Sequence, residues 1–178
     1  MIFFLFLVIG FDKIASMIQI VNSNKQSSAN NDVVQDTVQV ASIEHLLHQA
    51  NAWSATSIDA LIESKYNHLL VVKEWTHTDE TIIGYCLYHQ LFEIGEVLRI
   101  GTHPNWQRQG IALRLLQQLI AILKADNVER LLLEVRADNT PAISLYNKLG
   151  FMQIDCRKGY YKSDHGHHVD ALIMQLML

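Results

Sequence analysis

Apolar and polar residues alternate through the middle of the chain with the two-residue period of β-strands. Three such runs cover His68 to Trp75, Thr81 to Gln90 and Glu96 to Thr102. Polar turns at 77–80 and 93–96 separate them. Because these connections are short, we expect the three strands to pair in antiparallel fashion.

A helix is predicted from about Gln109 to Ala125, after His103-Pro104 ends the third strand. Its apolar residues recur at spacings of three and four, so we expect them to form a wide buried face. These residues are Ile111, Leu115, Leu116, Leu119, Ile120, Ile122 and Leu123.

The C-terminal half alternates strands with a helix. We predict a strand at Arg130 to Arg136, a helix at Asn139 to Leu149 that Gly150 ends, and strands at Phe151 to Tyr161 and Val169 to Leu176. This order predicts an α/β (α+β) fold with a mixed, mostly antiparallel central sheet flanked by helices.

Two short helices are expected before the sheet. Ser42 is a candidate N-cap for a helix through Ala50, and Ser57 for a second helix through Lys65. The polar stretch from Asn22 to Asp36 favours a linker. We therefore predict one folded domain at residues 33–178 and an N-terminal extension at residues 1–32.

The first residues carry an apolar run from Ile2 to Phe11. This run is about half of the roughly 20 residues that a membrane-spanning helix needs. It also lacks the basic leader of a secretory signal, since Asp12 and Lys13 follow it. We interpret it as an upstream extension, with Met17 as a candidate start of the chain; a membrane-associating tail is the alternative.

Composition narrows the function classes. The 178 residues are 49% hydrophobic, and the formal net charge of −4 argues against binding nucleic acid through many phosphates. Cys86 and Cys156 lack zinc-ligand spacing and are expected to be buried thiols in a reducing, cytoplasmic compartment. The histidines at 165, 167 and 168 have no further ligand placed by spacing, so we expect a solvated loop and no metal.

The segment from Arg99 to Ala112 joins the third strand to the long helix through a tight turn. Such a helix start leaves backbone N–H groups unpaired, and the helix dipole favours an anion there. Longer side chains than those of Gly110 and Ala112 would keep a phosphate away from these amides. The chain has neither GxxxxGK[ST] nor GxGxxG. Taken alone, Gly110 is equally a simple helix-start residue.

The sequence QRQGIA at 107–112 resembles the Gln/Arg-x-x-Gly-x-Gly/Ala signature of the GNAT acetyltransferases. The segments 131–139 and 142–151 resemble the LEVR-x-x-N and AI-x-LY-x-x-LGF stretches of RimI-type members, and so do Tyr160-Tyr161 and 170–174. The resemblance runs from about Ala41 to the C-terminus. It implies the GNAT fold and transfer of an acetyl group from acetyl-CoA to an amine, without a metal.

The resemblance also implies cofactor contacts. The strand end at Ile100, Gly101 and Thr102 should pair with the pantetheine arm and offer a backbone N–H to the thioester oxygen. Asn139 contacts the cofactor in RimI-like enzymes, and an N-cap role is compatible with that contact. The residues expected to hold the diphosphate are Arg108, Gln109, Gly110, Ile111, Ala112 and Leu113.

Two side chains are candidates for the chemistry. Strand alternation places Glu134 and Arg136 on one face, so Glu134 is either a general base among apolar neighbours or a surface glutamate paired with Arg136. Tyr146 shares a helix face with apolar residues, as a core tyrosine would. The resemblance instead makes Tyr146 the general acid that protonates the departing thiolate of coenzyme A.

The acceptor side is less defined. Arg99 and His103 stand where RimI-type enzymes usually have asparagine and aspartate. Trp53 is either a core anchor or a wall of the acceptor groove. Tyr160 and Tyr161 are either groove residues or ordinary strand aromatics.

We expect the acceptor to be a peptide N-terminus. About one-tenth of an α-amino group is neutral at pH 7, against less than about one-thousandth of a lysine, so a modest base suits the former. The RimI resemblance implies the N-terminal alanine of a small-subunit ribosomal protein. The alternatives are a small-molecule amine or a protein lysine as acceptor, and a non-catalytic acyl-CoA-binding module, against which Glu134 and Tyr146 argue. The sequence leaves the oligomeric state open.

Overall fold

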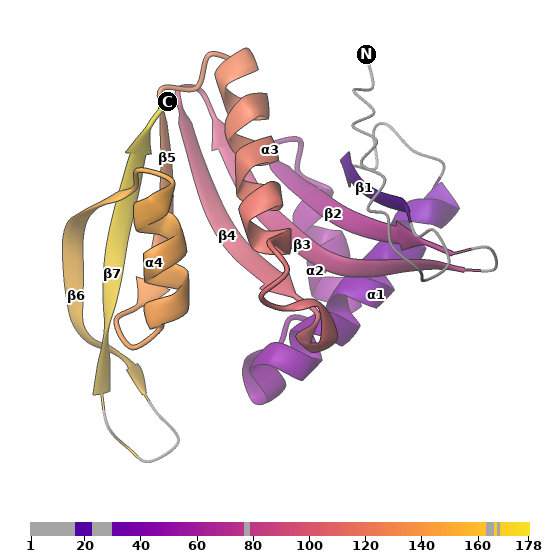
Figure 1. The fold of residues 1–178 in the computed structure, drawn as a ribbon, viewed down its shortest axis with the longest axis horizontal. Coiled ribbons are helices and arrows are strands. Elements are labelled where there is room, and N and C mark those ends of the chain that lie inside the picture. Colours follow the sequence, from indigo (N-terminus) through magenta and orange to yellow (C-terminus); the bar gives the residue numbers. More distant parts are fainter. Residues whose placement is uncertain (1–16, 23–29, 77–78, 163–165, 167) are drawn as a thin grey trace. The chain divides into compact units, whose positions relative to one another are not determined.

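The computed structural model describes residues 17–22, 30–76, 79–162, 166 and 168–178 (Figure 1). The elements in chain order are β1 (Met17–Asn22), α1 (Asn30–His48), the 3₁₀ turn η1 (Gln49–Asn51), α2 (Ala55–Ile62), β2 (Asn67–Trp75), β3 (Glu80–Leu91), β4 (Ile94–Thr102), the 3₁₀ turn η2 (Pro104–Trp106), α3 (Ile111–Ala125), β5 (Arg130–Arg136), α4 (Thr140–Lys148), β6 (Met152–Lys162) and β7 (His168–Met177).

The chain divides into two compact units, one within residues 1–88 and 99–119 and the other at 89–98 and 120–178. In the first unit β1, β2, β3 and the last part of β4 are neighbours in that order. In the second unit the first part of β4 is followed by β5, β7 and β6. β4 pairs with β5 in parallel, whereas β1 with β2 and β7 with both β5 and β6 are antiparallel. The predicted mixed sheet is confirmed.

The six predicted strands and the helices at 109–125 and 139–149 are present, with ends that shift by no more than two residues. The alternation in β5 is also as expected. Leu131, Leu133 and Val135 are buried, while Glu134 and Arg136 on the other face are half-exposed. A strand with one buried face keeps this period because a slip of one residue would exchange the two faces.

The predicted linker is wrong from Asn30 onward, where α1 begins. Ser42 is not an N-cap but lies inside α1, and its hydroxyl donates to the Val38 carbonyl at 3.1 Å. Apolar periodicity did not predict the first turns of α1 because the buried face of this helix includes polar residues, among them Asp36 and Thr37. The second helix also starts earlier than predicted, with Ser54 as the N-cap that accepts the Ser57 N–H at 3.1 Å.

The predicted N-terminal extension contributes a strand to the first unit. β1 pairs with β2 from Met17 opposite Trp75 to Asn22 opposite Leu70. The apolar run at 2–11 and residues 23–29 of the predicted linker lie outside the described residues. Of the helices that the structure describes, none is long and apolar enough to cross a membrane.

The turn between β3 and β4 is shorter than the predicted four residues. It consists of Phe92 and Glu93, with Phe92 at a φ of 51°. Gly95, which was predicted to lie in the turn, belongs to β4. A Cβ added there would lie 2.8 Å from Leu123 Cδ1, so this glycine lets α3 approach the strand closely.

A carboxylate without solvent access joins four parts of the first unit. The side chain of Glu44 on α1 has 0% exposure and accepts hydrogen bonds from the Tyr85 hydroxyl on β3 and from the Trp53 N–H at 3.1 Å. His48 Nε2 lies 3.5 Å away and Arg99 Nε of β4 lies 3.9 Å away. Burial and the Glu44 hydrogen bond raise the pKa of Tyr85, and burial lowers the pKa of His48.

A second ion cluster also ties α1 to the sheet. Lys73 on β2 is buried, and its ammonium contacts Asp36 of α1 at 2.8 Å and Glu80 of β3. Buried charges are tolerated only when they are paired in this way.

The two cysteines differ in their surroundings. Cys86 on β3 is fully buried, and burial raises the pKa of its thiol to about 12. Cys156 on β6 is half-buried, with its Sγ 3.6 Å from Asp170 Oδ2. The predicted buried, unpaired thiol is therefore confirmed for Cys86 and only partly for Cys156.

The Glu44 network predicts the effect of removing its charge. Glu44→Gln keeps the side-chain size but replaces an acceptor oxygen with a donor and leaves Arg99 without its counter-charge, so we expect the free energy of unfolding to fall by about 2–4 kcal/mol. Urea titration followed by tryptophan fluorescence measures this change. The exposed Glu96 provides a control, Glu96→Gln, expected within about 0.5 kcal/mol of wild type. Equal stabilities of the two variants would contradict the prediction.

Candidate active site

The start of α3 is shaped by two residues with left-handed backbone. After η2, Arg108 has a φ of 63° and Gly110 a φ of 80°. The helix begins at Ile111, and the Arg114 N–H donates to the Gly110 carbonyl at 3.0 Å. The N–H groups of residues 110–113 therefore precede the first helical hydrogen bond, as at any helix start. These are the amides that the sequence predicts to face a diphosphate.

Gly110 borders open space. A Cβ built on it would meet no atom of the described structure within 4 Å, and residues 107–110 are exposed. Packing therefore does not require a glycine here, whereas the positive φ favours one. The turn is held by amide side chains, since Gln107 Nε2 donates to the Thr102 carbonyl and Gln109 Nε2 to the Asn105 carbonyl, both at 3.3 Å.

The end of β4 and the start of α3 meet at Gly84 of β3. A Cβ on Gly84 would lie 2.6 Å from Ile111 Cγ2 and 3.3 Å from the Gly101 carbonyl oxygen. Gly101 is equally confined, since its Cβ would lie 2.5 Å from the Tyr85 ring. The structure thus brings together the strand end at Ile100, Gly101 and Thr102 and the first turn of α3 in the first unit.

Arg99 lies beside Trp53 in the same unit. Its guanidinium carbon is 4.9 Å from the Trp53 ring centre, and its Nη2 donates to the Asn51 carbonyl at 3.2 Å. His103 accepts the Asn105 N–H on Nδ1 at 3.3 Å and serves as the cap of η2. Trp53 is half-buried, and its ring packs on the Arg99 side chain, which anchors the loop between α1 and α2 against β4.

In the second unit, Glu134 on β5 is bound by two residues of β6. The Tyr161 hydroxyl donates to Oε1 at 2.6 Å, and Arg157 Nη1 donates to Oε2 at 2.8 Å. The Glu134 side chain is 24% exposed. The Arg136 guanidinium binds Asp138 through two hydrogen bonds of 3.0 and 2.7 Å, so the surface ion pair that is seen for Glu134 is the one with Arg157.

Asn139 caps the start of α4, and Tyr146 lies within the helix. The Asn139 side chain accepts the Ala142 N–H at 3.3 Å, which confirms the N-cap prediction. Tyr146 is 6% exposed, and its ring centre lies 5.7 Å from that of Phe151. Glu134 and Tyr146 therefore lie on different elements, each with partners of its own.

Sequence reasoning missed Glu44 and Arg157. Glu44 follows Val40 and Ile43 on the buried face of α1, so a charge at helical spacing among apolar residues was the available signal. Arg157 carried no such signal, because its pairing with Glu134 depends on the strand order β5-β7-β6.

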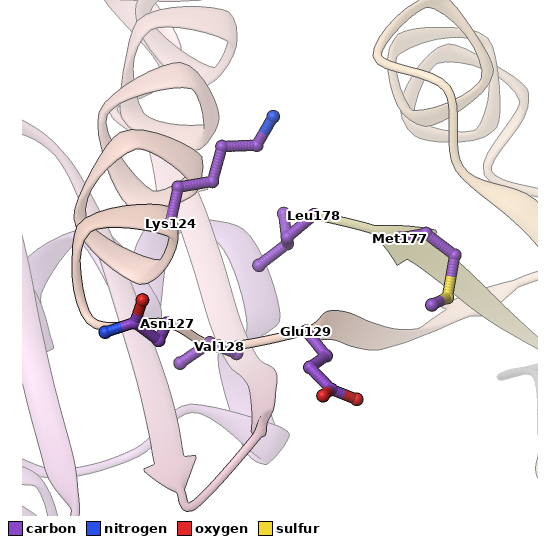
Figure 2. A pocket seen from close by; sticks show the side chains of 6 residues that line it. All are labelled: Lys124, Asn127, Val128, Glu129, Met177 and Leu178. Atoms are coloured by element: carbon purple, nitrogen blue, oxygen red, sulfur yellow. The ribbon is translucent and has the colours of Figure 1, made fainter.

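Neither the hollow in the second unit nor the histidine cluster contains a predicted site residue. A hollow in the second unit is lined by Lys124, Asn127, Val128, Glu129, Met177 and Leu178 (Figure 2). Among the described residues no group of three or more His, Cys, Asp or Glu side chains could hold a metal ion. His168 instead has its Nδ1 2.9 Å from the Gly159 carbonyl, and residues 165 and 167 of the histidine cluster lie outside the described part.

Comparison with known proteins identifies the family. Residues 38–151 match the model of the Acetyltransferase (GNAT) family. A protein of Haemophilus ducreyi named [ribosomal protein bS18]-alanine N-acetyltransferase is 35% identical over 146 residues, which cover 82% of this chain and 97% of that protein. Its Escherichia coli namesake is 29% identical over 79% of this chain and 93% of that protein.

Solved structures agree with this family. The crystal structure of the ribosomal-protein-S18-alanine N-acetyltransferase from Escherichia coli superposes with a TM-score of 0.71 at 26% identity, covering 89% of this chain and 93% of that one. Arabidopsis thaliana NAA60 in complex with acetyl-CoA shares the fold with a TM-score of 0.69 at 16% identity, covering 90% and 98% of the two chains. This chain therefore belongs to the GNAT family and is an acetyl-CoA-dependent N-acetyltransferase.

Proposed function

We propose that this enzyme acetylates the N-terminal alanine of a small-subunit ribosomal protein. The observation that carries the proposal is the match, over most of both chains, to relatives whose names state bS18-alanine N-acetylation. A ribosomal acceptor and acetyl-CoA also make the cytoplasm the expected place of the reaction.

The start of α3 fits the diphosphate of acetyl-CoA. Four backbone N–H groups precede the first helical hydrogen bond, and the space beside Gly110 is open. A helix N-terminus favours an anion through these amides and through its dipole. In the proposal, residues 108–113 hold the diphosphate, residues 100–102 hold the pantetheine arm, and Asn139 adds a further contact.

Glu134 and Tyr146 receive the proton-transfer roles. Amide formation requires loss of a proton from the attacking amine and gain of a proton by the departing thiolate. Glu134 would accept the first proton, directly or through water, and the Tyr146 hydroxyl would supply the second. Partial exposure of Glu134 supports the first role because a base has to be reached by its substrate. Burial of the Tyr146 ring fixes its position on α4.

Gly110→Ala tests the diphosphate site. A methyl group at this position would crowd the amides, so we expect KM for acetyl-CoA to rise about tenfold or more, the equivalent of one hydrogen bond to a charged group. Steady-state kinetics with varied acetyl-CoA provides the measurement. Gly166 has a similar φ of 76° and also borders open space, so Gly166→Ala controls for backbone strain and should leave this KM unchanged. If Gly110→Ala and Gly166→Ala had the same KM for acetyl-CoA, the diphosphate site at the start of α3 would be refuted.

Glu134→Gln tests the base. We expect kcat at pH 7 to fall by about 10² to 10⁴, while the Kd of acetyl-CoA stays near the wild-type value, because the amide cannot accept the proton. Turnover and calorimetric binding are measured on the same preparations. Glu129→Gln, just before β5, is the control and should keep full turnover. Wild-type turnover in Glu134→Gln would remove Glu134 from the mechanism.

The acceptor is tested with labelled acetyl-CoA and a panel of amines. The panel contains a peptide with a free N-terminal alanine, the same peptide with a blocked N-terminus and an internal lysine, and a polyamine. We expect label on the free α-amino group, located by tandem mass spectrometry, since a larger fraction of that amine is neutral at pH 7. Label confined to the lysine peptide or to the polyamine would exclude N-terminal acetylation while leaving the enzyme an acetyltransferase.

A further inference from the structure

Both oxygens of the Glu134 carboxylate are held, each by a different residue of β6. Oε1 accepts from the Tyr161 hydroxyl at 2.6 Å and Oε2 from Arg157 at 2.8 Å. Hydrogen bonds to an ionised acceptor are short and strong, and two of them fix the plane of the carboxylate. Each oxygen retains further lone-pair capacity, so the group is oriented without being blocked as a proton acceptor.

The sheet register explains why these residues reach Glu134 across an intervening strand. Glu134 lies opposite Ile173 of β7, while Arg157 and Tyr161 lie opposite Ala171 and Val169. The three β7 residues alternate by two and therefore share one face of the sheet. Their partners on β5 and β6 lie on that same face, where long side chains can meet above β7.

An irregularity in β6 brings Tyr161 to this position. Four steps along β6, from Arg157 to Tyr161, correspond to two steps along β7. In a regular ladder Gly159, which has no side chain, would stand opposite Val169. The bulge substitutes Tyr161 for it, and Gly159 takes a φ of 60° to make the bend.

Asp170 on β7 holds the bulge in place. Its Oδ1 accepts the Gly159 N–H at 2.8 Å, and its Oδ2 accepts from the Lys158 ammonium at 2.8 Å. Lys158 and the Gly159 amide keep the pKa of Asp170 below its usual range, so the carboxylate stays ionised. The Tyr161 ring is further located by Arg136, whose guanidinium carbon lies 5.2 Å from the ring centre.

We propose that Tyr161 and Arg157, held by the Asp170-pinned bulge of β6, are positioning residues that orient the Glu134 carboxylate for proton transfer. The proposal rests on the proposed function, since it takes Glu134 as the base. It assigns a purpose to the bulge and gives Tyr161 a different role from Tyr160, a residue that is 55% exposed.

A double-mutant cycle between Tyr161→Phe and Glu134→Gln tests this role. Tyr161→Phe retains the ring and loses only the hydroxyl, so we expect kcat to fall about ten- to hundredfold with the Kd of acetyl-CoA unchanged. In the Glu134→Gln background the same change should alter kcat by less than about twofold, because there is no carboxylate left to orient. Tyr66→Phe, in the first unit, controls for loss of a tyrosine hydroxyl and should leave kcat unchanged.

The outcomes separate this proposal from the proposed function. If Glu134→Gln lowers kcat but Tyr161→Phe lowers it by the same factor in both backgrounds, Tyr161 acts independently of Glu134 and the positioning role is overturned. If Tyr161→Phe has wild-type kcat, the role is likewise overturned. If the wild-type enzyme prefers another amine, the cycle is carried out with that amine. The positioning role is then still tested, even though the proposed acceptor is wrong.

Arg157 provides a second test with a rescue. Arg157→Met should lower kcat in the wild-type background and much less in Glu134→Gln, whereas Arg157→Lys, which restores a cation, should recover part of the loss. A lysine variant as slow as the methionine variant, together with equal effects of Arg157→Met in both backgrounds, would indicate a merely structural side chain. Thermal melting of each variant checks that it is folded.

Discussion

The charge of Glu44 is the constraint on which the first unit depends. A carboxylate that has lost its water costs several kcal/mol unless donors and cations replace the lost solvation. Here α1 supplies the carboxylate, β3 supplies the Tyr85 hydroxyl, the loop after η1 supplies the Trp53 amide, and β4 supplies Arg99. If β3 or the loop after η1 shifts, the carboxylate loses a hydrogen-bond donor, and if β4 shifts, it loses its nearby cation. The strand end at 100–102 is adjacent to Arg99, so this network also determines where the proposed pantetheine contacts lie.

Glu134 is the same residue type in a different environment, and its proposed role as a base depends on that difference. Glu44 has 0% exposure, whereas Glu134 keeps 24% and has two partners that still leave room for a proton. The first carboxylate therefore holds structure, while the exposure of the second is compatible with the proposed exchange of protons with a substrate. Because the two side chains are identical, the contrast comes from how deeply each carboxylate is buried and from the residues that contact it.

Sequence patterns predicted most of the fold because apolar periodicity reports burial directly. Strand β5 was predicted from alternation, and helices α3 and α4 from helical spacing together with the residues that end the neighbouring elements, His103-Pro104 and Gly150. The same reasoning failed for α1, whose buried face contains Asp36, Thr37 and Glu44 and so reads as polar. It also misread Gly95 as a turn residue, since a glycine needed for helix packing looks the same in sequence as one needed for a bend. The contacts of Arg157 and Tyr161 with Glu134 depend on strand order and on a bulge, and a single sequence shows neither. The positive φ of Gly110, in contrast, agrees with the turn expected from the motif.

The unequal burial of the two cysteines offers a practical means of observing the second unit. The thiol of Cys86 is enclosed in β3 and hardly ionises at neutral pH, so maleimide dyes react slowly with it in the native protein. Cys156 is reachable and adjoins Arg157 on β6, beside the Asp170 carboxylate. The unmodified chain thus provides one preferred attachment point for a fluorophore, and this point lies next to Arg157, where the bulge of β6 begins.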